Sequence, residues 1–212
     1  MDVTTAAEKL DDLDSYRFTV VIETHSTQSG QGTLADGSVT MSGTVINAPS
    51  PASSLHMVSA DPAGTVTDDT EIIVIGAAAW VRSGGSTGAW QAIPADQATF
   101  FTALLEGFRP EQMFSLYFSP IGQDNTAVGD EDVNGIATTH YRAGESVGLI
   151  LGAIAGVQGS WTAEVWIARD GGYLVRSQAG VEGSDATGGG RFALRVDVTD
   201  VDSPSNTIVP PS

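Results

Sequence analysis

Apolar and polar residues alternate with a period of two over much of the chain, and this pattern predicts β-strands. The run 16–24 (YRFTVVIET) places Tyr16, Phe18, Val20 and Ile22 on one face and polar residues on the other, as in a half-buried strand. Similar runs predict strands at 32–34, 39–47, 54–59, 71–75, 78–82, 89–92, 126–133, 136–143, 161–169, 173–183 and 191–202. Turn signals rich in glycine, proline and aspartate separate them, which favours an antiparallel meander.

Two segments in the middle of the chain have apolar residues at helical spacing instead. Residues 95–108 (ADQATFFTALLEGF) and 110–118 (PEQMFSLYF) are bulky and apolar, and prolines stand near their starts. A shorter amphipathic helix is predicted at 4–14. Strands grouped around segregated helices predict an α+β domain in which the helices cover one face of an antiparallel sheet. A closed lipocalin-like barrel is the alternative, but it leaves no obvious place for the central helices.

The sequence Asn134-Gly135 stands between two strand-like runs and is the strongest local signal in the chain. Both central residues of a two-residue hairpin turn need positive φ, which Asn and Gly adopt readily. The same region, with Asp130 and Asp132 before Asn134, also matches the opening of a calcium-binding loop. The twelfth position is Tyr141, however, where such a loop requires glutamate, so we expect a hairpin.

Length and composition indicate the number of domains and exclude several classes of function. A chain of 212 residues fits one domain spanning 1–212, with a loose tail at 203–212. It has 26 acidic and 9 basic residues, a net charge of −17, and no basic cluster, which argues against nucleic-acid binding. The absence of cysteine excludes disulfides, thiol catalysis and cysteine-ligated metals. The most apolar segment, 147–157, is too short to span a bilayer and is expected to form a lid or a packed loop.

The strings that match catalytic or metal-binding motifs are better explained by structural roles. The string 84–88 (GGSTG) matches the letters of the nucleophile elbow around Ser86, but no helix follows it, so a hairpin loop is the better interpretation. The three histidines, His25, His56 and His140, lie far apart in the sequence, and none belongs to a motif that presents two ligands on one face. We therefore predict no enzyme activity, no cofactor and no metal site, and treat the histidines as ordinary strand residues.

What remains is a surplus of apolar side chains on the predicted sheet and helices. They could pack into a solid core, or they could line a cavity between sheet and helices, because ligand sites are usually apolar clefts with few polar groups. The candidate lining residues are Phe18, Val20, Ile22, Met41, Met57, Phe100, Phe101, Leu104, Leu105, Met113, Phe114 and Tyr117.

Several strings, in this order along the chain, resemble a known group of proteins. They are LDSYRFTV at 13–20, VNGIATTHYR at 133–142, VWIARDGGYLVRSQ at 165–178 and DVTDVDSPSNTIVPP at 197–211. Together they resemble LolA-like cell-envelope lipoproteins, and in particular the LppX/LprG-type branch. The resemblance covers nearly the whole chain, but the matching strings mark strands and hairpins rather than a catalytic centre.

This resemblance implies a strongly curved, open half-barrel sheet with helices packed on its concave face. It also implies an apolar cavity for the acyl chains of a lipid or lipoprotein, and an extracytoplasmic, monomeric protein anchored to the membrane by a lipidated cysteine upstream of residue 1. The alternative is an envelope interaction or sensor domain of the same fold that binds no ligand.

Overall fold

One antiparallel sheet dominates the structure, a computed structural model that describes residues 3–26, 36–118, 121, 124–145, 147, 159–185 and 188–211. The strands are β1 (Ser15–Ser26), β2 (Gly37–Ile46), β3 (Ala52–Ala60), β4 (Val66–Ile75), β5 (Ala78–Ser83), β6 (Gln91–Ile93), β7 (Asn125–Val133), β8 (Ile136–Ala143), β9 (Ser160–Ala168), β10 (Leu174–Asp185) and β11 (Gly188–Thr199). The strand predicted at 32–34 and the segment 147–157, apart from Val147, lie outside the described residues.

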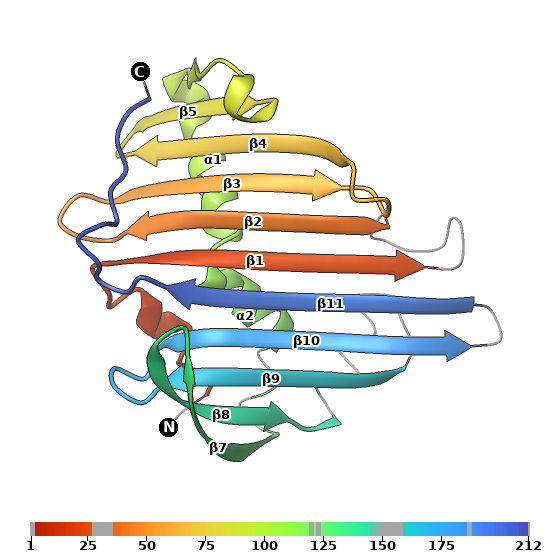
Figure 1. The fold of residues 1–212 in the computed structure, drawn as a ribbon. Helices are drawn as coiled ribbons and strands as arrows, with labels where there is room; N and C mark the ends of the chain where they lie inside the picture. Colours follow the sequence, from red (N-terminus) through yellow and green to blue (C-terminus); the bar gives the residue numbers. More distant parts are fainter. Residues whose placement is uncertain are drawn as a thin grey trace.

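The sheet is open and not a closed barrel. Its 11 strands follow the order β6-β5-β4-β3-β2-β1-β11-β10-β9-β8-β7, so that the first and last strands of the chain pair with each other at the centre (Figure 1). Strands β6 and β7 form the two edges, and no pairing joins them in the part of the chain that the structure describes. The predicted α+β half-barrel is therefore confirmed, and the lipocalin-like alternative is wrong.

The central helices form where the apolar spacing predicted them. Helix α1 spans Ala95–Gly107 and helix α2 spans Pro110–Phe118, and both lie on one side of the sheet (Figure 1). Proline precedes α1 and opens α2; its fixed φ suits the first turn, where no backbone N–H donor is needed. The two helices thus cover the inner, concave face.

The amino-terminal segment differs from its prediction. Only a short 3-10 helix, η1 (Glu8–Leu10), forms there, and no side chain caps its start. Asp11, Asp12 and Asp14 follow directly, and negative charges at the end of a helix oppose its dipole and shorten it. The helix predicted at 4–14 is therefore shorter than expected, and Ala7 and Leu10 of its apolar side are buried in the core.

The hairpin predicted at Asn134-Gly135 is confirmed. The two residues have φ of 55° and 78° and join β7 to β8, with Val133 opposite Ile136. The Asn134 amide also bridges to the central sheet, since its Nδ2 donates to the Val198 carbonyl at 3.1 Å. The turn is therefore fixed both by its own backbone and by a contact with β11.

Strand register places the apolar positions of neighbouring strands in continuous rows on the inner face. Val196 lies opposite Val20, Val20 opposite Met41, and Met41 opposite Met57. A slip of one residue would turn each of these side chains to the outer face, so burial fixes the register.

The carboxy-terminal segment crosses the opposite, outer face of the sheet (Figure 1). Arg17 Nη2 donates to the Ser205 carbonyl at 3.1 Å, and the buried Asn206 amide donates to Ser15 Oγ at 3.0 Å and to the Asp200 carbonyl at 2.6 Å. These contacts attach residues 205 and 206 to the start of β1.

Substitution of Gly43 in β2 tests the close packing of β2 against β3 and Phe18. A Cβ atom there would lie 2.3 Å from the Ser54 carbonyl oxygen and 2.6 Å from the Phe18 ring. We expect Gly43→Ala to lower the free energy of unfolding by about 1–3 kcal/mol, the usual cost of overpacking. The matched control is Gly107→Ala at the end of α1, where nothing lies within 4 Å of the added carbon. It should stay within about 0.5 kcal/mol of the parent protein in urea titrations; equal effects of the two substitutions would contradict the packing described.

Candidate functional site

The inner face of the sheet and the two helices together form one apolar cluster. Six of the twelve predicted lining residues are buried in it: Phe18, Val20, Met41, Leu105, Met113 and Phe114. The first three come from adjacent strands β1 and β2, and the others from α1 and α2. Phe114 also stacks on Phe118 with ring centroids 5.6 Å apart. The structure therefore brings the sheet and helix components of the predicted site into one cluster.

Five further candidates are only half-buried and border this cluster: Ile22, Met57, Phe101, Leu104 and Tyr117. Burial raises the pKa of the Tyr117 hydroxyl. These side chains pack against the core on one side and still have exposed area on the other. They form the part of the apolar surface that another apolar molecule could cover without displacing the core.

Phe100 is the one candidate that the structure does not bring to the others. It is 66% exposed, whereas its neighbour Phe101 packs against the core. Successive residues of an α-helix point about 100° apart, so two adjacent phenylalanines cannot both face the sheet.

The apolar surface extends beyond the predicted residues. Val39, Leu194, Ala179 and Ala163 follow Ile22 across strands β2, β11, β10 and β9, and Trp161 on β9 is half-buried against the same core. Alternation within each strand could have identified these positions, but only the register shows that they form one row. The two alanines leave little side-chain volume on the inner face there.

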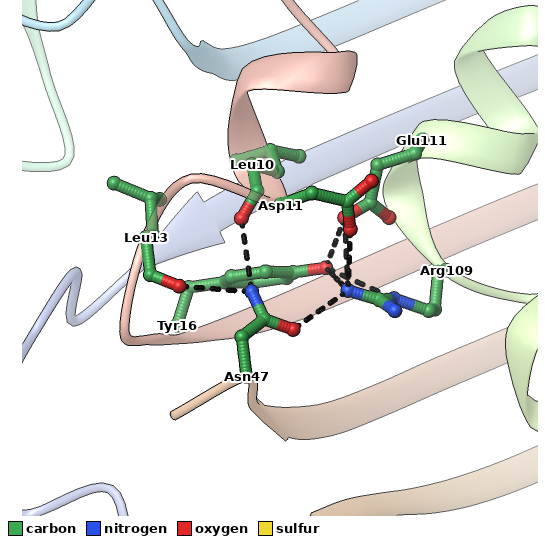
Figure 2. Close-up of polar contacts among 7 residues, drawn as sticks. All are labelled: Leu10, Asp11, Leu13, Tyr16, Asn47, Arg109 and Glu111. Carbon is green, nitrogen blue, oxygen red and sulfur yellow. Dashed lines mark hydrogen bonds and ion pairs between the residues drawn. The ribbon is translucent and has the colours of Figure 1, made fainter. Parts of the chain in front are cut away.

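A buried polar network lies at the other end of the inner face, where β1 begins. Tyr16 Oη donates a 2.5 Å hydrogen bond to Glu111 Oε1, and Arg109 Nη2 lies 3.3 Å from the same oxygen (Figure 2). The Glu111 side chain is 9% exposed and that of Arg109 is 20% exposed. The carboxylate of Glu111 on α2 thus joins Tyr16 on β1 to Arg109, which lies between the two helices.

The network continues to the amino-terminal segment. Arg109 Nη2 donates to Asp11 Oδ1 and to Asn47 Oδ1, both at 3.1 Å, and Asn47 Nδ2 donates to the carbonyls of Leu10 and Leu13 (Figure 2). Each contact links segments that are distant in the sequence. The network therefore attaches the helix pair and the η1 segment to strands β1 and β2.

Burial governs the protonation of this network. It raises the pKa of the Tyr16 hydroxyl, and the neighbouring Glu111 carboxylate raises it further, so this phenol remains a hydrogen-bond donor. Burial also raises the pKa of Glu111, while Arg109 and the Tyr16 hydrogen bond act in the opposite direction. Tyr16 and Arg109 both contact Glu111 Oε1, whereas Glu111 Oε2 is buried without a hydrogen-bond partner. The contacts that join the helix pair to β1 favour an anchoring role for this network. The sequence signal was the Arg-Pro-Glu string at a helix start, but its partners could not be read from it.

The loop at residues 84–88, whose letters match a nucleophile elbow, joins two strands through a short 3-10 turn. Ser86 is exposed on the 3-10 turn η2 (Gly85–Thr87), between β5 and β6. Among the described residues no histidine forms a hydrogen bond to it; His56 lies next to Asp69, and His140 next to Glu131.

Comparisons with known proteins identify the fold. No protein-family model matches the chain, and a search of curated protein sequences found no relative. Among solved structures, LprF from Mycobacterium bovis is 18% identical, with 98% of this chain and 94% of that chain covered at a TM-score of 0.50. The lipoprotein LppX from Mycobacterium tuberculosis is also 18% identical, with 98% and 96% covered and a TM-score of 0.44.

The match to LprF shows the fold. The predicted resemblance to LolA-like lipoproteins of the LppX/LprG type is therefore confirmed at the level of architecture. None of the helices in the described part of the chain combines the length and the apolar character that crossing a membrane requires.

Replacing the cation of the network gives a direct test of its anchoring role. We expect Arg109→Met to lower the free energy of unfolding by about 3 kcal/mol at pH 7, because it leaves the Glu111 carboxylate buried without a cation. Without Arg109 the pKa of folded Glu111 rises further. A carboxyl group whose pKa is higher in the folded state destabilises the fold as pH rises from its ordinary pKa to the folded value. The loss should therefore be smaller at pH 5 than at pH 7 in denaturation measurements.

Arg17→Met is the matched control for this prediction. Arg17 pairs with Asp200 at 3.7 Å, and both side chains are nearly half exposed. Its loss should cost less than about 1 kcal/mol. The anchoring role would be refuted if Arg109→Met were as mild as Arg17→Met, or if its effect were the same at both pH values.

Proposed function

We propose that this protein is a non-catalytic lipoprotein domain that binds the acyl chains of a lipid or lipid-modified molecule between its sheet and helices. The observation that supports this most is the half-buried apolar surface on the inner face, which includes Ile22, Val39 and Met57 next to the fully buried core. Apolar side chains that are only partly covered inside a folded domain can line a ligand site, because such sites are apolar clefts with few polar groups. The fold shared with LprF supports the same proposal.

The energetics of an acyl chain suit such a surface. Each buried methylene contributes about 0.8 kcal/mol, so ten methylenes contribute about 8 kcal/mol before the costs of association. No charged anchor is needed for a binding energy of this size. Methionines 41 and 57, which face each other across β2 and β3, can adapt their flexible side chains to chains of different shape.

The two ends of the inner face would then have different roles. At the start of β1, the network of Tyr16, Arg109 and Glu111 fixes the helices to the sheet. Ile22 and Val39 lie opposite each other nearer the far end of β1, beyond that anchor, and are only half-buried. We expect an acyl chain to cover this far end and to leave the anchored end unchanged.

We further propose that the domain acts as a monomer in the cell envelope, anchored through a lipidated cysteine upstream of residue 1. The resemblance of this sequence to cell-envelope lipoproteins supports this location. Fractionation of cells that express the full reading frame, with and without replacement of such a cysteine, tests it. Release of the variant from the membrane fraction is the expected result, and an unchanged distribution would contradict the proposed anchor.

Substitutions at two adjacent β1 positions test the acyl-binding surface. Ile22 points to the inner face, and Val21 points to the outer face, opposite Arg195. We expect Ile22→Glu to weaken binding of a fluorescent long-chain fatty acid by more than about tenfold, because it places a charge on the surface that buries methylenes. Val21→Glu should bind the probe as the parent protein does. Fluorescence titration measures the affinities, and circular dichroism verifies that both variants are folded.

Equal binding by the two variants would place the acyl chain elsewhere. Absence of binding by the parent protein, with no lipid extracted from it, would refute the carrier function. The same fold would then serve as a ligand-free interaction domain, the alternative expected from the sequence.

A further inference from the structure

Three potential metal ligands meet on the outer face of the sheet, away from the acyl-binding surface. His56 on β3 lies directly opposite Glu71 on β4 in the strand register. Asp69 is two residues before Glu71 in the same strand, and alternate residues of a strand share a face. The sequence places these residues up to 15 positions apart, and the β3–β4 hairpin brings them together.

The spacing of the donor atoms suits one small cation. One ligand atom from each of His56, Asp69 and Glu71 lies within 4.8 Å of the other two. His56 Nε2 is 2.8 Å from Asp69 Oδ1. Ligands bound at about 2.0–2.2 Å to a tetrahedral zinc ion lie slightly farther apart than 2.8 Å, so only a small side-chain movement would be needed. All three residues are partly exposed, which leaves a path from solvent.

A neighbouring glycine-rich loop packs against Asp69. Gly84 N donates to the Asp69 carbonyl at 2.9 Å, and Gly85 packs directly against the Asp69 side chain. A Cβ atom on Gly85 would lie 2.5 Å from Asp69 Oδ2, and φ at Gly85 is +66°, a conformation that favours glycine. The glycine at position 85 thus leaves room for the Asp69 carboxylate beside His56, and a larger residue there would displace it.

A groove beside the cluster provides room for further ligands. It has a volume of about 550 Å³ and is lined by His56 and Glu71 from the sheet and by Thr207, Ile208 and Val209 from the carboxy-terminal segment. A cation held by three protein ligands needs at least one more, and water in this groove can supply it.

The net charge of the side chains around the cluster also favours binding of a cation. Glu71 forms an ion pair with Arg82 on β5, so the two carboxylates and the one guanidinium together carry a net charge of −1. Arg82 also lies over the Trp90 ring, with its Cζ 4.7 Å from the ring centroid. It therefore keeps a second partner when Glu71 turns an oxygen toward a metal. Arg82 therefore competes with a metal ion for the Glu71 carboxylate but does not prevent the ion from binding.

We propose that His56, Asp69 and Glu71 form a binding site for a divalent transition-metal ion, with Zn²⁺ as its best-suited occupant. One imidazole nitrogen and two carboxylate oxygens match the ligand types of zinc, whereas Mg²⁺ and Ca²⁺ prefer oxygen ligands alone. The site is independent of acyl binding, since it lies on the opposite face of the sheet. It gives the outer face a function separate from that of the inner face.

Calorimetric titration of the complete chain, without a polyhistidine tag, with zinc chloride tests the proposal. We expect binding of one Zn²⁺ per chain, together with a Zn²⁺-dependent rise in melting temperature, because a ligand of the folded state stabilises it. His56→Ala and Asp69→Asn should each weaken binding by more than about tenfold, since even loss of an outer partner of a metal ligand costs that much. His25→Ala, an exposed histidine on β1, is the matched control and should leave binding unchanged.

Replacement of Arg82, which competes with the metal ion for Glu71, should raise the Zn²⁺ affinity rather than lower it. Arg82→Gln frees Glu71 from its ion pair, so it should tighten Zn²⁺ binding severalfold. Titration with Co²⁺ provides a spectroscopic check, because absorption from bound cobalt should appear in the parent protein and be lost with His56→Ala. Absence of Zn²⁺ binding by the parent protein would overturn the proposal, as would equal losses with His56→Ala and His25→Ala.

Discussion

The structure depends on one constraint, the need to cover the apolar inner face of a sheet that does not close. A closed barrel would cover this face by its own curvature, but here the edge strands β6 and β7 remain apart. Helices α1 and α2 therefore pack against the inner face with Leu105, Met113 and Phe114. Where helical side chains do not cover the sheet fully, half-buried residues such as Ile22 and Met57 remain. The proposed acyl-binding function follows from this incomplete coverage.

The two faces of the sheet differ in their chemistry. The inner rows are apolar, whereas the outer face of the central strands carries charged pairs, such as Arg176 with Asp197 at 2.6 Å. Hydrogen bonds from Arg195 and Arg176 outweigh burial and lower the pKa of Asp197, so this carboxylate stays charged. The Tyr16, Arg109 and Glu111 network is the exception on the inner side, and it is stable there because its members are paired with one another.

Much of the fold could be predicted from the sequence because the period of the apolar pattern determines each element separately. The alternation at Tyr16, Phe18 and Val20 and the helical spacing near Phe114 both correspond to elements of the structure. The apolar spacing alone predicts a longer helix than η1, because it does not reflect the acidic residues that follow Leu10. Apolar character alone groups Phe100 with Phe101, but one helix face cannot include both, and Phe100 is exposed.

Contacts between distant segments could not be predicted. Tyr16 and Glu111 are 95 residues apart, and nothing local to either residue indicates the other. The convergence of His56 with Asp69 and Glu71 likewise depends on the register of β3 against β4, which one sequence does not specify. For the same reason, Asn206 in a proline-rich tail gave no sign of its contact with Ser15.

The central claim is that the inner face binds acyl chains, and lipid analysis of the protein as purified tests it most directly. The protein would be isolated from a bacterial host without detergent, extracted with organic solvent and analysed by mass spectrometry against protein concentration. The account predicts close to one acyl-bearing lipid per chain, as well as a matching mass increment in native mass spectrometry. Lipid far below one per chain, together with a single unliganded mass and no uptake of added lipid, would contradict it.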